Sequence, residues 1–508
     1  MNTVVKDPNE FGKIRAFFWP IFNDELKKFL PMGMMMFFIL FVYTVLRNTK
    51  DTLIVTNVGT EVLPVLKGAV VLPAAILFVI LYAKLTNILS RETIFHLLVA
   101  VFIAFFGAFA LYLYPNRHII HPSPELIHSL QASYPLLKSF FPVYGVWSYS
   151  AFYVLSELWG SVMISLLFWQ FANEITRTQE AKRFYAMFGL LANFALIASG
   201  TAVKYFAELS KAMPEGVDVW GVTLNYTMFA VVLSGLFVMI IYRWMNKNVL
   251  TDPKYYDAAE IAGKPKKDKP KLSVMESLKY IFTSKYLGFI AILIIAYGMS
   301  INLVEIIWKE QLKHQFPNPN DYQAFMGEFS RATGFATIAL ILMLKGVVKK
   351  FGWFAGAIIT PVVLFVTAVI FFGFIFLEES FSPLATAFGV TSLFMAVIVG
   401  ATQNIFSKAT KYSLFDPTKE MAYIPLDQEL KVKGKAAVDV IGGRLGKAGG
   451  GYIALGLLLM TQGTTMDIAP YVAAIVIFVI LAWMFAASGL SKMYNSLIKT
   501  QEAAVKKA

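Results

Sequence analysis

The side chains of this sequence that could do chemistry are ionisable groups inside strongly apolar stretches. Glu157 lies midway along the apolar stretch 143–171, and Glu305 lies in the stretch 286–308. An ionised side chain at the centre of a bilayer costs at least about 2.5–3.5 kcal/mol, so it faces a cavity, water or a partner of opposite charge. Both carboxylates are therefore candidates for a polar cavity. The alternative is a structural ion pair, for which Lys309 offers Glu305 a partner one turn away.

Aromatic side chains share a helix face with the first of these carboxylates. Tyr149, Tyr153 and Glu157 recur at four-residue intervals, so they form one stripe on a helix. Aromatic rings stack on planar groups, and tyrosine hydroxyls donate hydrogen bonds. The stripe therefore predicts a face that binds a planar ligand with polar edges. The alternative is a packing face whose carboxylate pairs with a neighbouring helix.

Further polar residues lie near the ends of two apolar stretches. Arg47 and Lys50 are three residues apart at the end of the first stretch, so they share a helix face. Asn302 lies three residues before Glu305 and therefore shares a helix face with it. We expect these side chains in the same cavity, and the alternative for the two cations is snorkelling to the outer interface. Lys67, in the second stretch, is a weaker candidate.

Two cations in the eleventh apolar stretch indicate an anion site. Arg444 and Lys447 lie three residues apart, so a helix points both toward one anion. Glycines recur at every fourth position from 442 to 450, which allows close helix packing. The segment resembles a phosphate-binding Walker A loop, but Ile441 and Ala448 replace two defining residues and no strand precedes it. An ATPase is therefore not expected.

The elements that must position these groups are membrane-spanning helices. Apolar residues make up 57% of the 508 residues and charged ones only 15%, whereas soluble proteins average about 45–50% and 25%. A helix crosses the hydrocarbon with roughly 20 apolar residues. Twelve stretches qualify: 31–49, 63–83, 94–114, 143–171, 184–206, 221–243, 286–308, 325–347, 353–377, 384–406, 434–460 and 469–490. The sequence therefore predicts an all-α membrane protein with twelve transmembrane helices.

A polar stretch divides these helices into two groups of six. We expect an N-terminal interfacial segment (1–30), a six-helix bundle (31–245), a cytoplasmic linker (246–285), a second bundle (286–490) and a cytoplasmic tail (491–508). Lys and Arg are concentrated in the termini, the linker and the alternate loops on the same side, which places both termini in the cytoplasm. Two six-helix halves joined by a long central loop are typical of major-facilitator carriers.

The composition argues against other classes of protein. There is no cysteine and there are only five histidines, none with metal-site spacing, so no metal site or cofactor is expected. The net charge of +13 is explained by basic cytoplasmic loops, or secondly by an anionic substrate, and no nucleic-acid partner is expected. No catalytic motif supports an enzyme, and nothing implies an obligate protein partner. The first residues lack the pattern of a signal or transit peptide.

Several stretches are similar to the nucleotide transporters (ATP/ADP translocases) of obligate intracellular bacteria and plant plastids. The similarity covers nearly the whole chain in the same order. The matching stretches are Trp19–Ile21, Glu25–Pro31, Arg47–Leu53, Ser156–Gly160, Val304–Lys309, Lys433–Ala437 and Leu445–Lys447. In that family, four intramembrane charges matter for transport, and the motifs place them at Lys50, Glu157, Glu305 and Lys447.

The resemblance implies an ATP/ADP antiporter that is embedded in the lipid bilayer of the cell inner membrane. Its transported substrates would be ATP and ADP. All four charges are present, as in the exchangers of the family. Other members import nucleotides with protons or carry NAD, so a proton-coupled nucleotide symporter or a carrier of another nucleotide is the alternative. In the symporter, Glu157 or Glu305 would take up the proton.

Overall fold

The computed structural model describes residues 12, 15, 19–256, 284–344, 346–427, 434, 435, 438 and 442–507, and within these ranges it is built from helices. The side chains at positions 178, 179, 182, 443, 444, 447 and 501–507 lie outside this description. Most of the expected linker, residues 257–283, also lies outside it.

Helices of the first half correspond to the six stretches expected there. They are α2 (Leu26–Asn57), α3 (Leu63–Val65) with η3 (Leu66–Val71) and α4 (Leu72–Ile88), α5 (Arg91–Ala108) with η4 (Phe109–Leu113), α9 (Trp147–Trp159) with η6 (Gly160–Phe168) and α10 (Trp169–Ile175), α11 (Thr178–Ser210) and α12 (Val219–Asn248). Shorter elements are η2 (Asn23–Glu25), α6 (Arg117–Ile120), α7 (Pro124–Ser133), η5 (Pro135–Leu137) and α8 (Phe141–Gly145).

The second half repeats this arrangement of long helices. Its elements are α15 (Lys285–Gln315), α16 (Pro319–Met343), α17 (Val347–Phe376), α18 (Glu378–Ala387), α19 (Ser392–Thr410) with η7 (Lys411–Phe415) and α20 (Asp416–Ala422), α22 (Gly443–Thr461) and α23 (Ala469–Lys507). α23 continues through the tail expected from residue 491, because that segment is rich in good helix formers such as Lys, Gln, Glu and Ala.

Nine helices of the described part are long and apolar enough to cross a membrane, or ten if the bent pair Glu378–Ala387 and Ser392–Ala422 is one span. The bend of 86° follows Gly389, whose φ of +72° is readily adopted by glycine. The remaining expected spans form α16, which carries Glu328 and Arg331, and α22, whose apolar part is the shorter helix Ala448–Thr461. All twelve predicted stretches therefore contain helix, and two of them are more polar or shorter than the rest.

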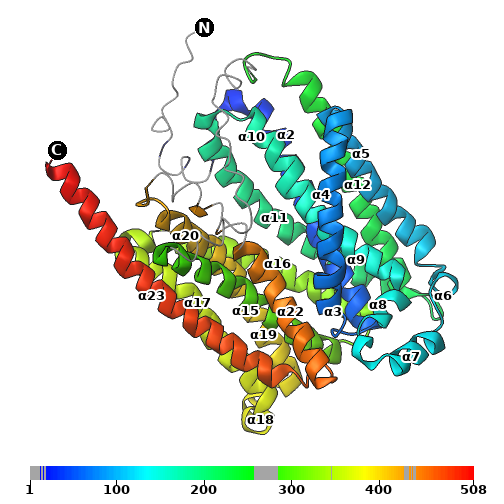
Figure 1. The fold of residues 1–508 in the computed structure, drawn as a ribbon. Helices are drawn as coiled ribbons and strands as arrows, with labels where there is room; N and C mark the ends of the chain where they lie inside the picture. The colour runs from blue at the N-terminus through cyan, green and yellow to red at the C-terminus, as the bar shows by residue number, and fades with distance from the viewer. Residues whose placement is uncertain are drawn as a thin grey trace.

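The helices have two distinguishable ends (Figure 1). α10, α20 and the end of α23 lie toward one side, which we call the α20 side. The short helices α6, α7 and α18 lie toward the opposite side, which we call the α18 side. α2 begins beside the start of α11, where Lys28 pairs with Glu180 at 2.7 Å, and it runs toward the α18 side.

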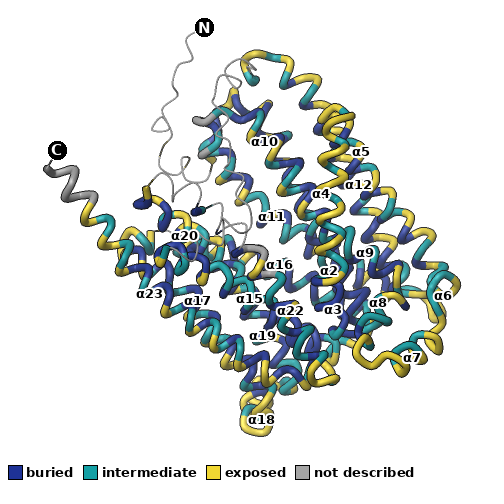
Figure 2. Tube along the Cα trace, viewed as in Figure 1, coloured by how far each residue is buried: buried dark blue, intermediate teal, exposed yellow. Residues whose placement is uncertain are grey.

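The two halves pack against each other along α11 and α16. Here the helices approach so closely that a Cβ added to Gly327 would lie 2.7 Å from the carbonyl oxygen of Gly200. Asn48 of α2 crosses the same junction and donates to the Ser330 hydroxyl (3.0 Å) and to the Met326 carbonyl (3.2 Å). Buried residues gather on such inward faces, whereas α4 and α18 are mostly exposed, as Figure 2 shows. The apolar outer faces, such as that of α4, suit contact with lipid.

The glycine stripe of the eleventh stretch packs α22 against α15. A Cβ added to Gly298 would lie 2.8 Å from the carbonyl carbon of Gly446, and one added to Gly450 would lie 3.0 Å from Cβ of Asn302. This contact is what the four-residue glycine spacing predicts, because small residues let helix backbones approach closely.

Replacing Gly298 with Ala is expected to lower the thermal stability of the purified protein. The added methyl group meets the Gly446 backbone, which cannot rotate away, and overpacking of this kind costs about 1–3 kcal/mol. Gly456 of α22 is the matched control, because a Cβ there meets nothing within 4 Å. Gly456→Ala should leave the melting temperature unchanged or raise it, and equal melting temperatures for both variants would contradict the packing described.

Candidate substrate-binding site

The candidate site lies along α2, where it passes between the two halves. The sequence predicts that the first span ends near residue 49, but α2 continues to Asn57, so Lys50 and Asp51 lie inside the helix. The hydroxyls of Thr49 and Thr52 donate to the backbone carbonyls four residues earlier, at 2.9 and 3.0 Å. These bonds satisfy the hydroxyls without interrupting the helix. The helix therefore carries its charges into the interior of the protein.

Lys50 is the cation at the centre of the site. Its Nζ lies 2.8 Å from Oδ1 of Asp51 and 3.1 Å from Oε1 of Glu157 on α9. It also lies 3.8 Å from the centre of the Tyr153 ring. Lys50 is almost fully buried, whereas 37% of the Glu157 side chain is exposed. Glu157 therefore has a partner on one side and an open approach on the other.

Asp51 joins the two halves. Its side chain is 0% exposed, and Nζ of Lys309 on α15 lies 2.9 Å from its Oδ2 as an ion pair. Lys309 also lies 3.3 Å from Oε1 of Glu305, the i,i+4 pair expected from the sequence. One carboxylate of the first half thus stands between lysines of both halves, Lys50 and Lys309.

Glu305 gathers three further polar groups around it. Arg47 of α2 donates to Oε1 of Glu305 at 3.1 Å. Lys67 of η3 lies 3.9 Å from Oε2 of Glu305 and donates to Oδ1 of Asn302 at 3.3 Å. The structure therefore brings Glu305, Arg47 and Asn302 together from both halves, and it adds Lys67, which the sequence favours only weakly.

Positive charge exceeds negative charge in this charge cluster. We define the cluster as the residues that these ion pairs connect, namely Arg47, Lys50, Asp51, Glu157, Lys67, Glu305 and Lys309, so it has four cations and three carboxylates. An excess of one positive charge in an interior poorly screened by water attracts anions. The cluster is thus suited to an anionic ligand.

Tyr149 lies apart from the charge cluster. It is 4% exposed, and its ring packs against Tyr114 and His121, with centroid distances of 6.2 and 5.0 Å. Only Tyr153 of the predicted aromatic stripe touches Lys50. The rings that cover Tyr149 come from the loop after α5, which helical periodicity in α9 cannot reveal.

Arg444 and Lys447 are the two predicted site residues of α22. The backbone of Arg444 and Lys447 belongs to α22, but both side chains lie outside the described residues. Their helix is held against α15 by the contact of Gly450 with Asn302. The anion-binding role of the two cations stays a prediction.

Lys408 of α19 is a half-buried cation that the sequence does not single out, and its Nζ lies 4.7 Å from the centre of the Phe329 ring on α16. It lies two residues beyond the predicted span 384–406, where a lysine is typical of a polar loop. In the structure the helical run Ser392–Ala422 continues past it. The signal that could have revealed it is the absence of a helix breaker before Pro417.

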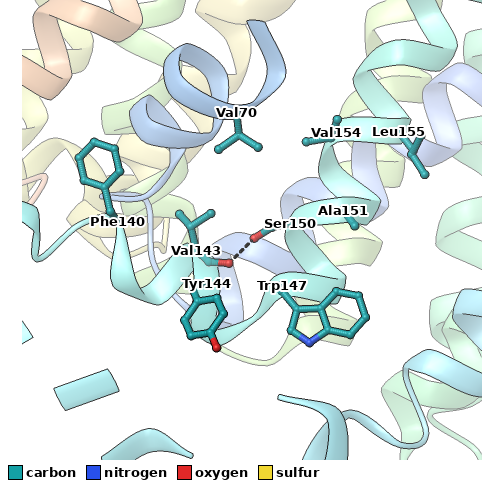
Figure 3. Close-up of a pocket in the computed structure, with 9 residues that line it drawn as sticks. All are labelled: Val70, Phe140, Val143, Tyr144, Trp147, Ser150, Ala151, Val154 and Leu155. Carbon is teal, nitrogen blue, oxygen red and sulfur yellow. Dashed lines mark hydrogen bonds between the residues drawn. The ribbon is translucent and has the colours of Figure 1, made fainter. Parts of the chain in front are cut away.

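One pocket in the described part of the chain lies apart from the charge cluster. It has a volume of about 450 Å³ and is lined mainly by apolar side chains of η3, α8 and α9, among them Val70, Tyr144 and Trp147 (Figure 3). The hydroxyl of Ser150 faces it but already donates to the carbonyl of Val143 at 2.8 Å. None of the cluster residues lines it, so it is not the candidate site.

Solved transporters share the overall fold. The chain is similar to a bacterial homologue of the iron transporter ferroportin in an inward-facing state, with a TM-score of 0.55, 11% identity and coverage of 91% of this chain and 99% of the other. It is also similar to a D-xylose–proton symporter, with a TM-score of 0.52, 12% identity and coverage of 92% and 97%. These likenesses show the fold alone, which is of the major-facilitator type.

Similar sequences cover nearly the whole chain. ADP,ATP carrier protein 1 of Chlamydia muridarum is 50% identical over 500 residues, covering 97% of this chain and 94% of its own. ADP,ATP carrier protein 1 of Rickettsia prowazekii is 46% identical, with coverage of 98% and 99%. The chloroplastic ADP,ATP carrier protein 1 of Arabidopsis thaliana is 48% identical, covering 98% of this chain and 78% of its own.

A family described as TLC ATP/ADP transporter matches residues 5–494. The match includes every residue of the charge cluster and both halves of the bundle. The identities to bacterial and plastid carriers extend over 97–98% of this chain. This chain therefore belongs to the TLC ATP/ADP transporter family.

Proposed function

We propose that this protein is an ADP/ATP antiporter that exchanges adenine nucleotides across a bacterial inner membrane by alternating access. The observation that carries the proposal is the charge cluster, in which cations outnumber carboxylates between the halves of a major-facilitator fold. Its relatives at about half identity are named ADP,ATP carriers. The substrates are then ATP and ADP, and the protein acts as a carrier rather than an enzyme.

The phosphate chain is the part of the substrate that the cluster suits best. ATP and ADP carry several negative charges, and Lys and Arg bind phosphate oxygens through strong charge-assisted hydrogen bonds. Lys50, Arg47 and Lys67 are available on the first half, while Arg444 and Lys447 are the predicted contacts on α22. Glu157 and Glu305 balance these cations when the site is empty.

We further propose that the α20 side faces the cytoplasm. Both termini and the basic linker are then cytoplasmic, as the distribution of Lys and Arg indicates. The two six-helix bundles, 31–245 and 286–490, act as the moving halves. The protein is thus a multi-pass inner-membrane carrier surrounded by lipid.

The contacts between the halves support alternating access. Beyond the charge cluster toward the α18 side, Thr60 donates to Oε2 of Glu310 at 2.5 Å and lies 2.7 Å from the hydroxyl of Thr465. Asp51 and Lys309 join the halves at the level of the cluster. These bonds hold the halves together on the α18 side. Their breakage would let a nucleotide leave toward that side, since carriers of this fold rock their halves about a central site.

Tyr153→Leu is expected to weaken binding of ATP and pyrophosphate alike. The ring lies beneath Lys50 at 3.8 Å, and a cation–π contact contributes about 0.5–2 kcal/mol, so the affinity for both ligands should fall by up to about 30-fold. Calorimetry on the purified protein measures both affinities.

Tyr149→Leu serves as the matched control on the same helix. Its ring packs against Tyr114 and His121, so the substitution should lower the melting temperature and leave nucleotide affinity within about twofold. A selective loss of ATP binding over pyrophosphate binding in either variant would instead place the base against that ring.

A panel of ligands tests the proposed substrates. The purified protein is heated with ATP, ADP, AMP, NAD or no ligand, because a ligand at 100 times its Kd stabilises the folded state by about 2.7 kcal/mol. ATP and ADP should raise the melting temperature most. Stabilisation by NAD in place of ATP and ADP would point to a carrier of another nucleotide.

The proton-coupled symporter is the second candidate, because one observation favours it. Glu157 is 37% exposed, and its ion pair within the described part of the chain is with Lys50, so a proton could reach it from the open side. Such a carrier would return empty after Glu157 binds a proton. Transport without internal nucleotide separates it from the antiporter.

A further inference from the structure

Glu305 is a carboxylate of the charge cluster that contacts cations of both halves at once. Its Oε1 lies 3.1 Å from Arg47 of α2 and 3.3 Å from Lys309 of its own helix, and its Oε2 lies 3.9 Å from Lys67 of η3. The second half thereby supplies one anion to two cations of the first half. Two contacts of Glu305 therefore join the halves, and the third lies within α15.

The exposure of the side chains distinguishes Glu305 from Asp51, the other carboxylate that joins the halves. The side chain of Asp51 is fully buried. That of Glu305 is 11% exposed, and those of its first-half partners Arg47 and Lys67 are 29% and 19% exposed. An anion from solvent can therefore approach the cations around Glu305, whereas the ion pairs of Asp51 are shielded from it.

Lys67 is held beside α15 by a group other than Glu305. Its distance of 3.9 Å from Glu305 is longer than a hydrogen bond, and its Nζ donates instead to Oδ1 of Asn302 at 3.3 Å. Asn302 is fixed in turn, because its amide donates to the carbonyl of Gly298 at 2.8 Å. Since lysine has three N–H donors, Lys67 can keep this bond and bind a further anion.

Glu305 can give up its first-half partners and still keep a counter-charge. Lys309 lies one helical turn away on α15, so this i,i+4 pair stays together however the halves move. A buried carboxylate without any cation is costly, but Glu305 is not left in that state. Its contacts with Arg47 and Lys67 can therefore be exchanged for contacts with another anion. A phosphate suits this exchange, because Arg and Lys bind its oxygens through charge-assisted hydrogen bonds.

We propose that Glu305 stands in for a substrate phosphate in the empty protein and that a phosphate of the nucleotide displaces it from Arg47 and Lys67. The proposal rests on the proposed function, because the displacing group is part of the same substrate. Glu305 then keeps its pair with Lys309, and its ion pairs with α2 and η3 are replaced by bonds from these elements to the ligand. Binding thereby loosens a contact between the halves, which must move relative to each other for transport.

Glu305→Gln tests this competition, because glutamine keeps the size of the side chain and removes its charge. Calorimetry on the full-length purified protein measures the affinities for ATP and for inorganic pyrophosphate. The substitution removes an anion that competes for the phosphate-binding cations, so both ligands should bind at least about 10-fold more tightly. If Glu305 served only to position Arg47 and Lys67, both affinities would fall instead.

Glu328→Gln is the matched control for the change in net charge. Glu328 of α16 also pairs with a cation of each half, Lys204 at 3.1 Å and Arg331 at 2.6 Å, but it does not belong to the charge cluster. Both affinities of this variant should stay within about threefold of those of the unchanged protein. A gain in Glu328→Gln as large as that in Glu305→Gln would overturn the proposal, because net charge alone would then explain both.

Melting curves provide a second measurement if Glu305→Gln is unstable without ligand. Loss of the carboxylate leaves Arg47, Lys67 and Lys309 to repel one another, so the empty variant should melt at a lower temperature than the unchanged protein. Pyrophosphate should raise the melting temperature of the variant by more than it raises that of the unchanged protein. Glu305→Asp, which keeps the charge on a shorter side chain, should fold and gain affinity for both ligands by about two- to fivefold.

Unchanged or weaker binding of ATP and pyrophosphate by folded Glu305→Gln and Glu305→Asp would overturn the proposal. A gain for ATP without a gain for pyrophosphate would also overturn it, because Glu305 would then oppose a part of the nucleotide other than its phosphates. The proposed function stays intact in both cases as long as the unchanged protein binds ATP and ADP. Absence of that binding would overturn the proposed function itself, whereas a gain in pyrophosphate binding would still support the competition.

Discussion

Asp51→Asn is expected to reduce nucleotide exchange to about 1% or less and to lower the thermal stability of the protein, because removing one partner of a buried ion pair costs about 3–5 kcal/mol. Asp51 is 0% exposed and lies between Lys50 and Lys309, at 2.8 and 2.9 Å. The neutral amide leaves two buried lysines facing each other across the halves. Exchange of labelled ATP in liposomes and a melting curve measure the two effects.

A less buried ion pair between the halves provides the control for Asp51. Lys204 of α11 lies 3.1 Å from Glu328 of α16, whose side chain is 40% exposed. Exposed pairs contribute about 0–1 kcal/mol, so Glu328→Gln should keep exchange within a few-fold of the unchanged protein. Asp51→Asn/Lys309→Met should regain stability relative to Asp51→Asn, since both charges of the pair are then removed. Normal exchange by Asp51→Asn would contradict a role in transport for the contacts of Asp51 with Lys50 and Lys309.

Lys50→Met is expected to abolish ATP binding and exchange together. Lys50 is the nearest cation to Glu157, at 3.1 Å, and it also contacts Asp51. Its loss removes a phosphate contact and leaves the carboxylates to repel the ligand, so the affinity for ATP should fall at least about 100-fold. Calorimetry and exchange in liposomes are the two measurements.

A second substitution distinguishes a phosphate contact from a structural role of Lys50. In Lys50→Met/Glu157→Gln, the charges of Lys50 and of Glu157 are both removed while Asp51 keeps its pair with Lys309, so the melting temperature should recover in part relative to Lys50→Met. Exchange should stay lost, because the cation that binds phosphate is still missing. Recovery of exchange by the double variant would show that Lys50 serves only to balance Glu157.

The cost of an intramembrane charge was the strongest guide from sequence to site. It singles out Arg47, Lys50, Glu157 and Glu305, and the structure places all four in the charge cluster. The same argument does not extend to Lys408, because the apolar pattern ends at residue 406 while the helix continues through η7 and α20. Helix continuation depends on packing against α16 and α17, which a hydropathy pattern does not contain.

Contacts between distant segments could not be predicted from local patterns. Lys50 and Asp51 are neighbours in sequence, and i,i+1 residues do not face each other on a helix. Asp51 nevertheless links Lys50 to Lys309, because α15 packs beside α2. Likewise, the stripe of α9 includes Tyr149, but rings of the loop after α5 cover it. The fold was easier to predict, since most of the spans follow from apolar length.

Exchange in liposomes tests the central claim most directly. An empty charge cluster that closes must bury its unbalanced cations, whereas a bound nucleotide neutralises them, so closure is favoured only with ligand present. Liposomes preloaded with ADP should therefore take up labelled ATP rapidly, empty liposomes should take up almost none, and an uncoupler should not abolish the exchange. Rapid uptake into empty liposomes that an uncoupler abolishes would contradict the antiporter and support the proton-coupled symporter.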